Sequence, residues 1–311
     1  MDGVLNVLKP TGMTSFDVVA YIRRLAGVKK VGHCGTLDPA AAGVLPICVG
    51  AATGLSDYLS SSGKSYRAEI LFGVHTDSID LDGAVVRSKR IQGPDRQAIS
   101  RVLSGFIGKQ YQTPPMYSAI KADGKRLYEL ARKGIEVKRE AREVTIYSLR
   151  LVWVMKGRAV IEVDCSKGTY IRSLCEDIGK KLGVDACMSF LIRTCSSGLL
   201  LSNAYTLEQL GTLGKSGRLE EAAIPIENML TGFPGCILSD AQLKRFMNGA
   251  DIDADVDGFA TEDGDKGACN ENLVKVFDRK SAFYALGKVV SVNGQDKLRV
   301  KKLFRKIEGI L

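Results

Sequence analysis

No stretch of the 311-residue sequence approaches the ~20 consecutive apolar residues that a membrane-spanning helix needs. The first residues, MDGVLNVLKPTGMTS, also lack the basic leader and long apolar stretch of a secretory signal peptide. We therefore expect a cytoplasmic protein without a membrane partner. With 45% hydrophobic and 25% charged residues, the composition is that of an ordinary globular chain, long enough for one large and one smaller domain.

Motifs for metals, disulfides and nucleotide phosphates are equally scarce. The eight cysteines include no C-x-x-C pair, and several stand in apolar runs, as Cys48 does in LPICVG, where a reduced buried thiol is the ordinary outcome. There are two histidines, His33 and His75, and neither G-x-G-x-x-G nor G-x-x-x-x-G-K followed by Ser or Thr occurs. The sequence therefore predicts no zinc site, no disulfide framework and no glycine loop for nucleotide phosphates.

Positive charge, by contrast, is plentiful and unevenly distributed. The formal net charge is +9; residues 1–234 hold 31 basic and 23 acidic side chains, whereas residues 235–311 hold 13 and 12. Residues 109–150 alone contain ten basic and five acidic side chains. Tyr111, Tyr117 and Tyr128 are interleaved with these basic residues. Such a mixture of cations and aromatic rings suits phosphates and unpaired bases, although a solvated helix with i,i+4 charge pairs is the alternative.

Hydrophobic periodicity predicts strands and helices without a regular βαβ alternation. GVLNVLKP is typical of a strand, and the helix after it is capped by Thr14 or Ser15 and ends at Gly27. A period-two pattern through residues 143–165 is interrupted at Lys156–Gly157, which predicts a hairpin. We therefore expect an α+β fold with a largely antiparallel central sheet flanked by helices.

Two segments are expected to lie outside this core. TGFPG, residues 231–235, is typical of a linker. The acidic, glycine-containing stretch at residues 251–267 is typical of an exposed loop.

The stretch VGHCGTLDPAAAGVLP places three reactive groups close together, on His33, Cys34 and Asp38. Adjacent residues of an extended segment point to opposite faces, so His33 is poorly placed to activate Cys34, and a thiol enzyme would depend on His75. Asp38 precedes Pro39, which favours an extended or turn conformation, and the surrounding Gly and Ala residues let a bulky ligand approach closely. Taken alone, an Asp-Pro pair is more often a turn than a catalyst.

Several segments of the chain together resemble one enzyme family. GHCGTLDPAAAGVLP is similar to the G-H-x-G-T-L-D-P-x-A-x-G-x-L-P signature of the TruB family, tRNA pseudouridine synthases that modify uridine 55 in the T arm. Further segments match in the family's order: GVLNVLKPTGMTS, KSYRAEILFG, PPMYSAIKADGKRLYELARKGIEVKREAR, CSKGTYIRSLCEDIG and FLIRT. The resemblance covers about residues 3–230 and implies the pseudouridine synthase fold.

The resemblance also implies a domain organisation. Residues 1–230 would form the catalytic domain, with residues 109–150 as an insertion that grips the RNA. Residues 235–311 resemble the PUA domain, a small β-rich RNA-binding module.

The resemblance assigns the chemistry to three residues. Asp38 matches the family's nucleophilic aspartate, and Arg172 matches the arginine that pairs with it. Tyr66 matches the tyrosine that lies against the target base and is the candidate for moving the C5 proton. An ionised carboxylate in a site that excludes water needs a cationic partner, which agrees with the Asp38–Arg172 pairing.

Other residues match positions that hold the substrate. Tyr170 and Leu191 match the lining of the uracil pocket, and His33 matches the histidine that enters the RNA loop. Lys9 would be a nearby structural or phosphate contact. Cys34 stands where relatives often have Thr, which fits a spacer better than a reactive centre.

The implied reaction needs neither a metal nor a cofactor, because nothing is hydrolysed or oxidised. We expect a monomer without an obligate protein partner, acting on the T arm of tRNA. One alternative is the guide-RNA-dependent relative of archaea and eukaryotes, which works in a ribonucleoprotein and generally lacks the insertion at residues 109–150. The other is a tRNA-binding or RNA-chaperone protein without catalysis, against which the set of Asp38, Tyr66 and Arg172 argues.

Reversing the charge of three cations in this insertion, Lys125, Arg126 and Arg132, should weaken tRNA binding and flatten its dependence on salt. Each phosphate contact that is lost releases fewer counterions, so the slope of log Kd against log salt concentration becomes smaller. The measurement is the Kd of unmodified tRNA over a series of salt concentrations. An unchanged slope would mean that these side chains are merely solvated.

Overall fold

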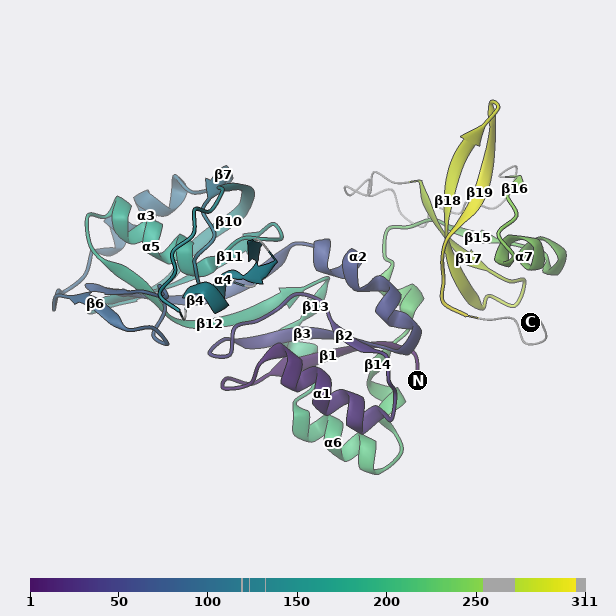
Figure 1. The fold of residues 1–311 in the computed structure, drawn as a ribbon, viewed down its shortest axis with the longest axis horizontal. Helices are drawn as coiled ribbons and strands as arrows, with labels where there is room; N and C mark the ends of the chain where they lie inside the picture. The colour runs from purple at the N-terminus through teal and green to yellow at the C-terminus, as the bar shows by residue number, and fades with distance from the viewer. Residues whose placement is uncertain (119, 123, 132, 254–271, 306–311) are drawn as a thin grey trace.

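The computed structural model describes residues 1–118, 120–122, 124–131, 133–253 and 272–305. Figure 1 shows two units, a larger one that carries the N-terminus and a smaller β-rich one at the C-terminal end. The predicted α+β class, with its largely antiparallel sheet and β-rich C-terminal region, is confirmed. Arg132, Cys269 and the acidic segment from residue 254 onward lie outside the described residues.

The larger unit is built on one sheet, in which the described residues form ten strands. Across the sheet the main path runs β14 (Ala223–Ile224), β1 (Gly3–Lys9), β3 (Ala42–Val49), β12 (Ala186–Ser196), β4 (Lys64–Phe72), β11 (Arg158–Cys165), β10 (Arg142–Met155) and β7 (Gly108–Gln112). Two short strands lie beside this path: β13 (Leu199–Leu200) pairs with β12, and β2 (Val31–His33) pairs with β3.

One short parallel pairing joins two antiparallel halves of this sheet. Strands β3 and β12 run parallel, with Ala42 opposite Ile192 and Gly43 opposite Arg193, whereas the other strand pairs of this sheet are antiparallel. Gly43 has a φ of 114°, and a Cβ there would lie 2.3 Å from the carbonyl oxygen of Arg193. The junction therefore requires glycine, because any side chain would force the two strands apart.

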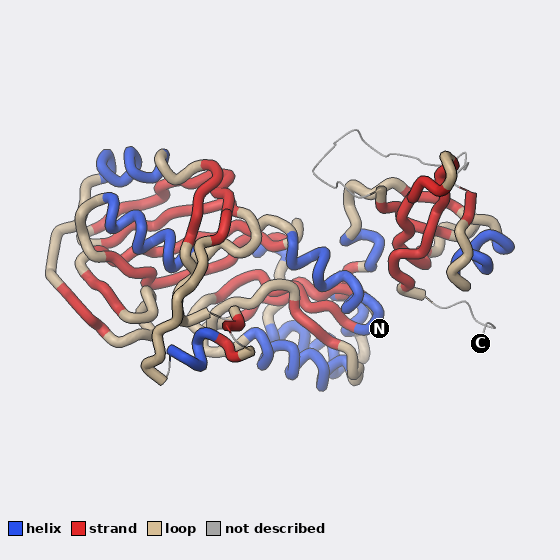
Figure 2. The backbone as a smooth tube through the Cα atoms, turned by 45° about the horizontal axis from the view of Figure 1, so that its top comes forward, coloured by secondary structure: helices blue, strands red, loops and turns tan. Residues whose placement is uncertain are grey.

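Helices pack on each half of the sheet. Helices α1 (Ser15–Ala26) and α6 (Leu207–Lys215) lie beside β1, β2 and β3, whereas α3 (Arg96–Ser104) and α5 (Ile171–Lys181) lie beside β10, β12 and β4 (Figures 1 and 2). The α1–α6 side has a core of strand and helix side chains: Leu5, Val7, Val18, Ile22, Leu45 and Leu210. The α3–α5 side has another, which includes Ile70, Ile99, Ile161, Leu174 and Ile178.

The predicted boundaries of α1 are confirmed. Thr14 caps the helix and accepts a hydrogen bond from the Asp17 amide, while the Asp17 carboxylate accepts one from the Thr14 amide. This reciprocal capping box satisfies backbone donors that the first turn leaves free. Gly27 ends the helix with a φ of 63°, a left-handed conformation that glycine adopts without a steric penalty.

The hairpin predicted at Lys156–Gly157 is also present, between β10 and β11. Upstream of β10, the predicted insertion begins and ends inside the sheet, because residues 109–112 belong to β7 and residues 142–150 to β10. The described residues between 113 and 141 lie off the sheet and include β8 (Lys121–Ala122), β9 (Lys125–Arg126) and α4 (Leu127–Ala131).

The C-terminal unit has a sheet of its own. Its strands lie in the order β15 (Gly235–Ile237), β17 (Leu273–Phe277), β18 (Phe283–Val292), β19 (Gln295–Leu303) and β16 (Ile252–Asp253), with α7 (Asp240–Met247) beside them. Strand β16 lies in the acidic segment that we expected to be an exposed loop, so that expectation is wrong at its first residues. The reason is that Ile252 is buried, while Asp251 pairs with Arg299 and Asp253 with Lys297.

An apolar core joins the two units. It combines residues of η1 (Gly50–Leu55), α2 (Ser56–Ser61) and η4 (Ile226–Met229) with residues of the C-terminal sheet. Leu59, Phe233 and Phe283 belong to this core, and the rings of Phe283 and Phe304 lie 5.6 Å apart between centroids. Since burial of apolar surface stabilises by about 25 cal/mol per Å², this contact favours a docked C-terminal unit.

Within the ranges that the structure describes, no helix combines the length and the apolar character needed to cross a membrane.

Other described elements are short: β5 (Val74–Thr76), β6 (Val85–Ser88), η2 (Leu201–Asn203) and η3 (Leu219–Ala222).

Replacing Gly43 by Ala should destabilise the fold by about 3 kcal/mol or more, because the new methyl group meets the Arg193 backbone in a left-handed conformation. The measurement is the free energy of unfolding in urea. Gly217→Ala is the matched control, since φ there is 71° and nothing lies within 4 Å of its Cβ position. It should cost only about 1 kcal/mol. Equal losses for the two variants would contradict the close approach of β3 and β12.

Candidate active site

The loop between β2 and β3, residues 34–41, lies where the two halves of the sheet meet. Its backbone turns at Asp38, where the Ala41 amide donates to the Asp38 carbonyl at 3.1 Å. Helix α1 holds the same loop through one hydroxyl: Ser15 Oγ accepts from the Leu37 amide at 2.9 Å and donates to the Leu37 carbonyl at 3.1 Å. The turn expected from Asp-Pro is therefore present. Ser15 binds both the amide and the carbonyl of Leu37, the residue before Asp38.

Arg193, on β12, fastens the two ends of this loop. Its side chain is fully buried and donates to the carbonyl oxygens of Val44 at 2.7 Å, Gly35 at 3.0 Å and Thr36 at 3.5 Å. Among the described residues no carboxylate lies within 4.0 Å of it. A buried cation is expensive unless its donors are satisfied, and here main-chain carbonyls satisfy them.

Lys9, at the end of β1, fastens the middle of the loop. Its buried amine donates to the carbonyl oxygens of Met13 at 2.6 Å, Pro10 at 2.8 Å and Pro39 at 3.2 Å. Burial lowers the pKa of Lys9 to about 8, and the nearby carboxylate of Asp38 opposes that fall. Of the two roles expected for Lys9, this geometry favours the structural one, because the amine faces carbonyls and not the surface.

Asp38 pairs with Arg172 in a partly open site. Arg172 Nη2 lies 3.0 Å from Asp38 Oδ2, and the exposed fractions of the two side chains are 5% and 43%. Arg172 Nη1 also lies 3.2 Å from Asp80 Oδ2, and the guanidinium donates to the carbonyls of Ser78 and Tyr117 at 3.1 and 2.7 Å. Because these partners fix the guanidinium, the Asp38 carboxylate faces a cation of defined position.

The electrostatic surroundings raise the pKa of Asp38 above its usual value. The largest cause is burial by the surrounding protein, which outweighs the opposing charge of Arg172; the carboxylates of Asp80 and Asp82 add to the rise. The chemical consequence is a more basic carboxylate than an ordinary surface aspartate, still exposed enough to meet a substrate.

Tyr66 and Leu191 lie on the inner face of the sheet, next to the loop. Strand β4 alternates buried and outward side chains, and Tyr66 stands opposite Arg193 of β12. Tyr66 and Leu191 are 8% and 7% exposed and belong to the same core cluster as Leu37, the residue before Asp38. Burial raises the pKa of Tyr66, while the charge of Arg193 and a hydrogen bond from it oppose that rise.

Tyr170 stands at the start of α5, two residues before Arg172. The side chain of Gln112 holds its backbone on both sides: Gln112 Oε1 accepts from the Tyr170 amide at 2.7 Å, and Nε2 donates to the Tyr170 carbonyl at 3.0 Å. Burial raises the pKa of the Tyr170 hydroxyl; the charge of Arg172 opposes that rise, and the charge of Asp38 adds to it. The structure therefore brings Tyr170 into the same electrostatic neighbourhood as the Asp38–Arg172 pair.

His33 and Cys34 face different surroundings, as expected for adjacent residues. The His33 ring packs edge to face with Phe16, at 6.0 Å between centroids, and burial lowers its pKa. The Cys34 sulfur is buried, 3.3 Å from the sulfur of Cys48. His75 lies on β5, with Nδ1 3.8 Å from Glu176 Oε1. This arrangement does not support the thiol-enzyme alternative.

Sequence reasoning did not single out three residues that shape the site: Ser15, Asp80 and Arg193. A weak signal existed for Arg193, because it is the one charged residue in the stretch FLIRT. In β12 it alternates with its neighbours along the strand, so that its side chain is buried while those of Ile192 and Thr194 are less buried. No local pattern marks Asp80, because its contact with Arg172 joins residues 92 positions apart.

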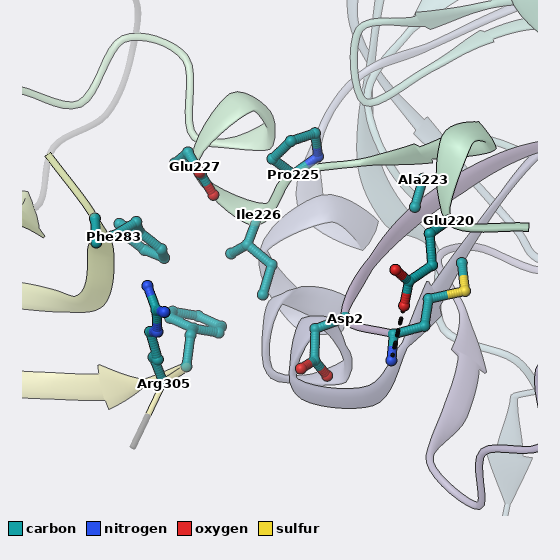
Figure 3. A pocket seen from close by; sticks show the side chains of 11 residues that line it. Asp2, Glu220, Ala223, Pro225, Ile226, Glu227, Phe283 and Arg305 are labelled. Carbon is teal, nitrogen blue, oxygen red and sulfur yellow. Dashed lines mark ion pairs between the residues drawn. The ribbon is translucent and has the colours of Figure 1, made fainter. Parts of the chain in front are cut away.

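A cavity of about 460 Å³ lies elsewhere, between the N-terminal strand and the C-terminal unit (Figure 3). None of the expected site residues lines it. Three carboxylates do, those of Asp2, Glu220 and Glu227, and the Met1 amine lies 3.4 Å from Glu220. Arg305 lines it as well, so three carboxylates face two cations, and the cavity attracts phosphates less than a basic surface would.

Family models match most of the larger unit. Residues 23–171 match the model described as the TruB family pseudouridylate synthase N-terminal domain, and residues 172–231 match that of the tRNA pseudouridylate synthase B C-terminal domain.

Whole-chain comparisons agree. The tRNA pseudouridine synthase B of Clostridium kluyveri is 41% identical over 304 residues, which cover 98% of this chain and all of the relative. That of Bacillus subtilis is 46% identical over 256 residues, which cover 80% of this chain and 83% of the relative. A chain in the crystal structure of a Cbf5–Nop10–Gar1 complex superposes with a TM-score of 0.71 at 28% identity, covering 97% of this chain and 85% of that one. With a relative this similar over essentially the full length of both sequences, the chain belongs to the TruB family of pseudouridylate synthases.

Proposed function

We propose that this enzyme converts uridine 55 in the T arm of tRNA to pseudouridine, with Asp38 as the nucleophile. The observation that carries the proposal is the Asp38–Arg172 pair, at 3.0 Å, in an open site that Tyr66, Tyr170 and Leu191 adjoin. The family and the relatives named tRNA pseudouridine synthase B support tRNA as the substrate.

The reaction exchanges one bond to the sugar for another. The N1–C1′ bond of the target uridine breaks, the uracil turns over within the site, and a C5–C1′ bond forms. The proton on C5 leaves and N1 ends protonated, so the product is an isomer of the substrate. An oxygen of Asp38 bonds transiently to the sugar or the base and later departs, which a carboxylate can do because it is both a nucleophile and a leaving group.

Arg172 keeps the Asp38 carboxylate available for this step. Its positive charge opposes the rise in the pKa of Asp38 that burial causes. Its contacts with Asp80 and two main-chain carbonyls hold the guanidinium in place throughout the reaction. A fixed cation next to the carboxylate needs no reorganisation when the charge on Asp38 changes.

Tyr66, Tyr170 and Leu191 are assigned to the uracil. Tyr66 lies against the base and moves the C5 proton, helped by the charge of Arg193, which opposes the rise in its pKa. Tyr170 and Leu191 line the pocket that retains the detached base. Excluding water there protects the intermediate from hydrolysis.

The target base must first leave a folded RNA loop, which costs a few kcal/mol of unstacking. His33 enters the RNA and helps to hold the flipped arrangement, as a neutral imidazole whose pKa burial lowers. Residues 109–150 grip the RNA outside the site.

The chain is assigned two domains. Residues 1–230 form the catalytic domain and residues 235–311 a PUA-like RNA-binding domain. The enzyme acts as a monomer, without a metal, a cofactor or a protein partner.

Asp38→Asn should abolish turnover while leaving tRNA binding intact, because the substitution removes the nucleophile and keeps its shape. The assay incubates purified protein with unmodified tRNA labelled at C5 of uridine and follows release of the label. We expect a loss of about a thousandfold or more, since no other group replaces a covalent nucleophile.

Cys34→Ala is the control in the same assay. Its sulfur contacts Cys48 and is fully buried, so its activity should stay within about threefold of the wild type. Full turnover by Asp38→Asn, with loss in Cys34→Ala instead, would exclude the aspartate mechanism.

A further inference from the structure

We propose that Phe16 is a stacking platform for an unpaired base of the substrate RNA, beside the catalytic loop. This inference rests on the proposed function, because it supplies the tRNA that the ring would contact. The Phe16 side chain is 66% exposed on the first turn of α1. A single exposed phenylalanine is unremarkable by itself, so the argument depends on what surrounds this one.

The position of Phe16 is fixed relative to the active site. The residue before it, Ser15, makes two hydrogen bonds to the backbone of Leu37, the neighbour of Asp38. The capping box of Thr14 closes the same turn of the helix. The contacts of its neighbours Thr14 and Ser15 therefore hold the turn that carries Phe16 next to the catalytic loop, with most of the Phe16 surface open to a ligand.

Phe16 also contacts His33, the last residue of β2, which is expected to enter the RNA. The rings of Phe16 and His33 meet edge to face, with centroids 6.0 Å apart and planes at 81°. In the part of the chain that the structure describes, His33 Nδ1 is buried without a hydrogen-bond partner. The two rings therefore lie side by side, and an RNA base that stacked on Phe16 would lie beside His33.

The surface around Phe16 has the charge that a polyanion requires. Phe16, Ala20 and Arg23 are spaced i, i+4 and i+7 and share one exposed face of α1. Arg23 Nη2 donates to the Val31 carbonyl at 3.4 Å, which places this face along β2.

More cations follow along the chain: Arg24 in the same helix, and Lys29 and Lys30 after it, are all exposed. Within the described ranges, none of these cations or Arg23 has a carboxylate within 4.0 Å. An aromatic ring beside unpaired cations is the combination that binds single-stranded nucleic acid, since bases stack on the ring and phosphates meet the charges. The acidic residue of this helix, Asp17, accepts hydrogen bonds from Thr14 in the capping box, so cations outnumber carboxylates on this surface.

The test compares four proteins with unmodified tRNA: the wild type, Phe16→Ala, Phe16→Tyr and Phe16→Leu. We expect Phe16→Ala to raise the Kd and the KM about tenfold, the loss typical of one stacked base. At saturating tRNA its kcat should stay within about threefold of the wild type, because the ring contacts the RNA and not the reacting atoms. Phe16→Tyr should restore the wild-type Kd, whereas Phe16→Leu, which is apolar but lacks a ring, should not.

Phe190→Ala is the matched control. Phe190 is 46% exposed on β12, where it pairs with Glu69 on the outward face of the sheet, opposite to Leu191. Its Kd should equal that of the wild type, and thermal unfolding should show that both alanine variants fold. A wild-type Kd for Phe16→Ala or for Phe16→Leu, or an equal loss in Phe190→Ala, would overturn the proposal.

A failure of the stacking role can be distinguished from a failure of the proposed function. Should the wild type bind tRNA without forming pseudouridine, the proposed function fails, and the Kd values still test the stacking role. Should the wild type form pseudouridine while Phe16→Ala retains its Kd and KM, only the stacking role fails.

Discussion

The rest of the site depends on the ion pair between Asp38 and Arg172. A partly buried carboxylate is stabilised in its ionised form by a nearby cation, most effectively by one whose position is fixed. Asp80 and two main-chain carbonyls hold the Arg172 guanidinium on its other sides. Arg172 stands on α5 two residues after Tyr170, so the element that holds the ion pair also positions a tyrosine that we assign to the uracil.

The loop that carries Asp38 is held by side chains from three separate elements. Arg193 of β12 binds its two ends, Lys9 of β1 its middle and Ser15 of α1 the backbone of Leu37. Burying two cations for this purpose costs stability, and main-chain carbonyls recover only part of that cost. The short parallel pairing of β3 and β12 is what brings Arg193 to the loop, so the least regular point of the sheet is also the one nearest to the chemistry.

Features that depend on local chemistry were predictable from the sequence. The cap at Thr14, the end of α1 at Gly27 and the hairpin at Lys156–Gly157 follow from residue preferences within a few positions. Contacts between distant segments do not follow from such local preferences, and Asp80 and Arg193 therefore remained unnoticed. The choice of Asp38 over Cys34 came from family resemblance, since the loop alone does not distinguish a catalyst from an Asp-Pro turn.

The pKa of Asp38 depends on two opposing effects, its burial and the positive charge of Arg172. Burial raises its pKa above the ordinary value of 3.8 more than Arg172 lowers it. The folded chain then holds the proton more tightly than the unfolded chain, so ionising Asp38 costs folding free energy as the pH rises above 3.8. A carbon-13 NMR titration of carboxyl-labelled aspartate, with the Asp38 signal assigned by its absence from Asp38→Asn, measures this pKa directly. We predict a midpoint above 3.8, whereas a midpoint at or below 3.8 would contradict the account.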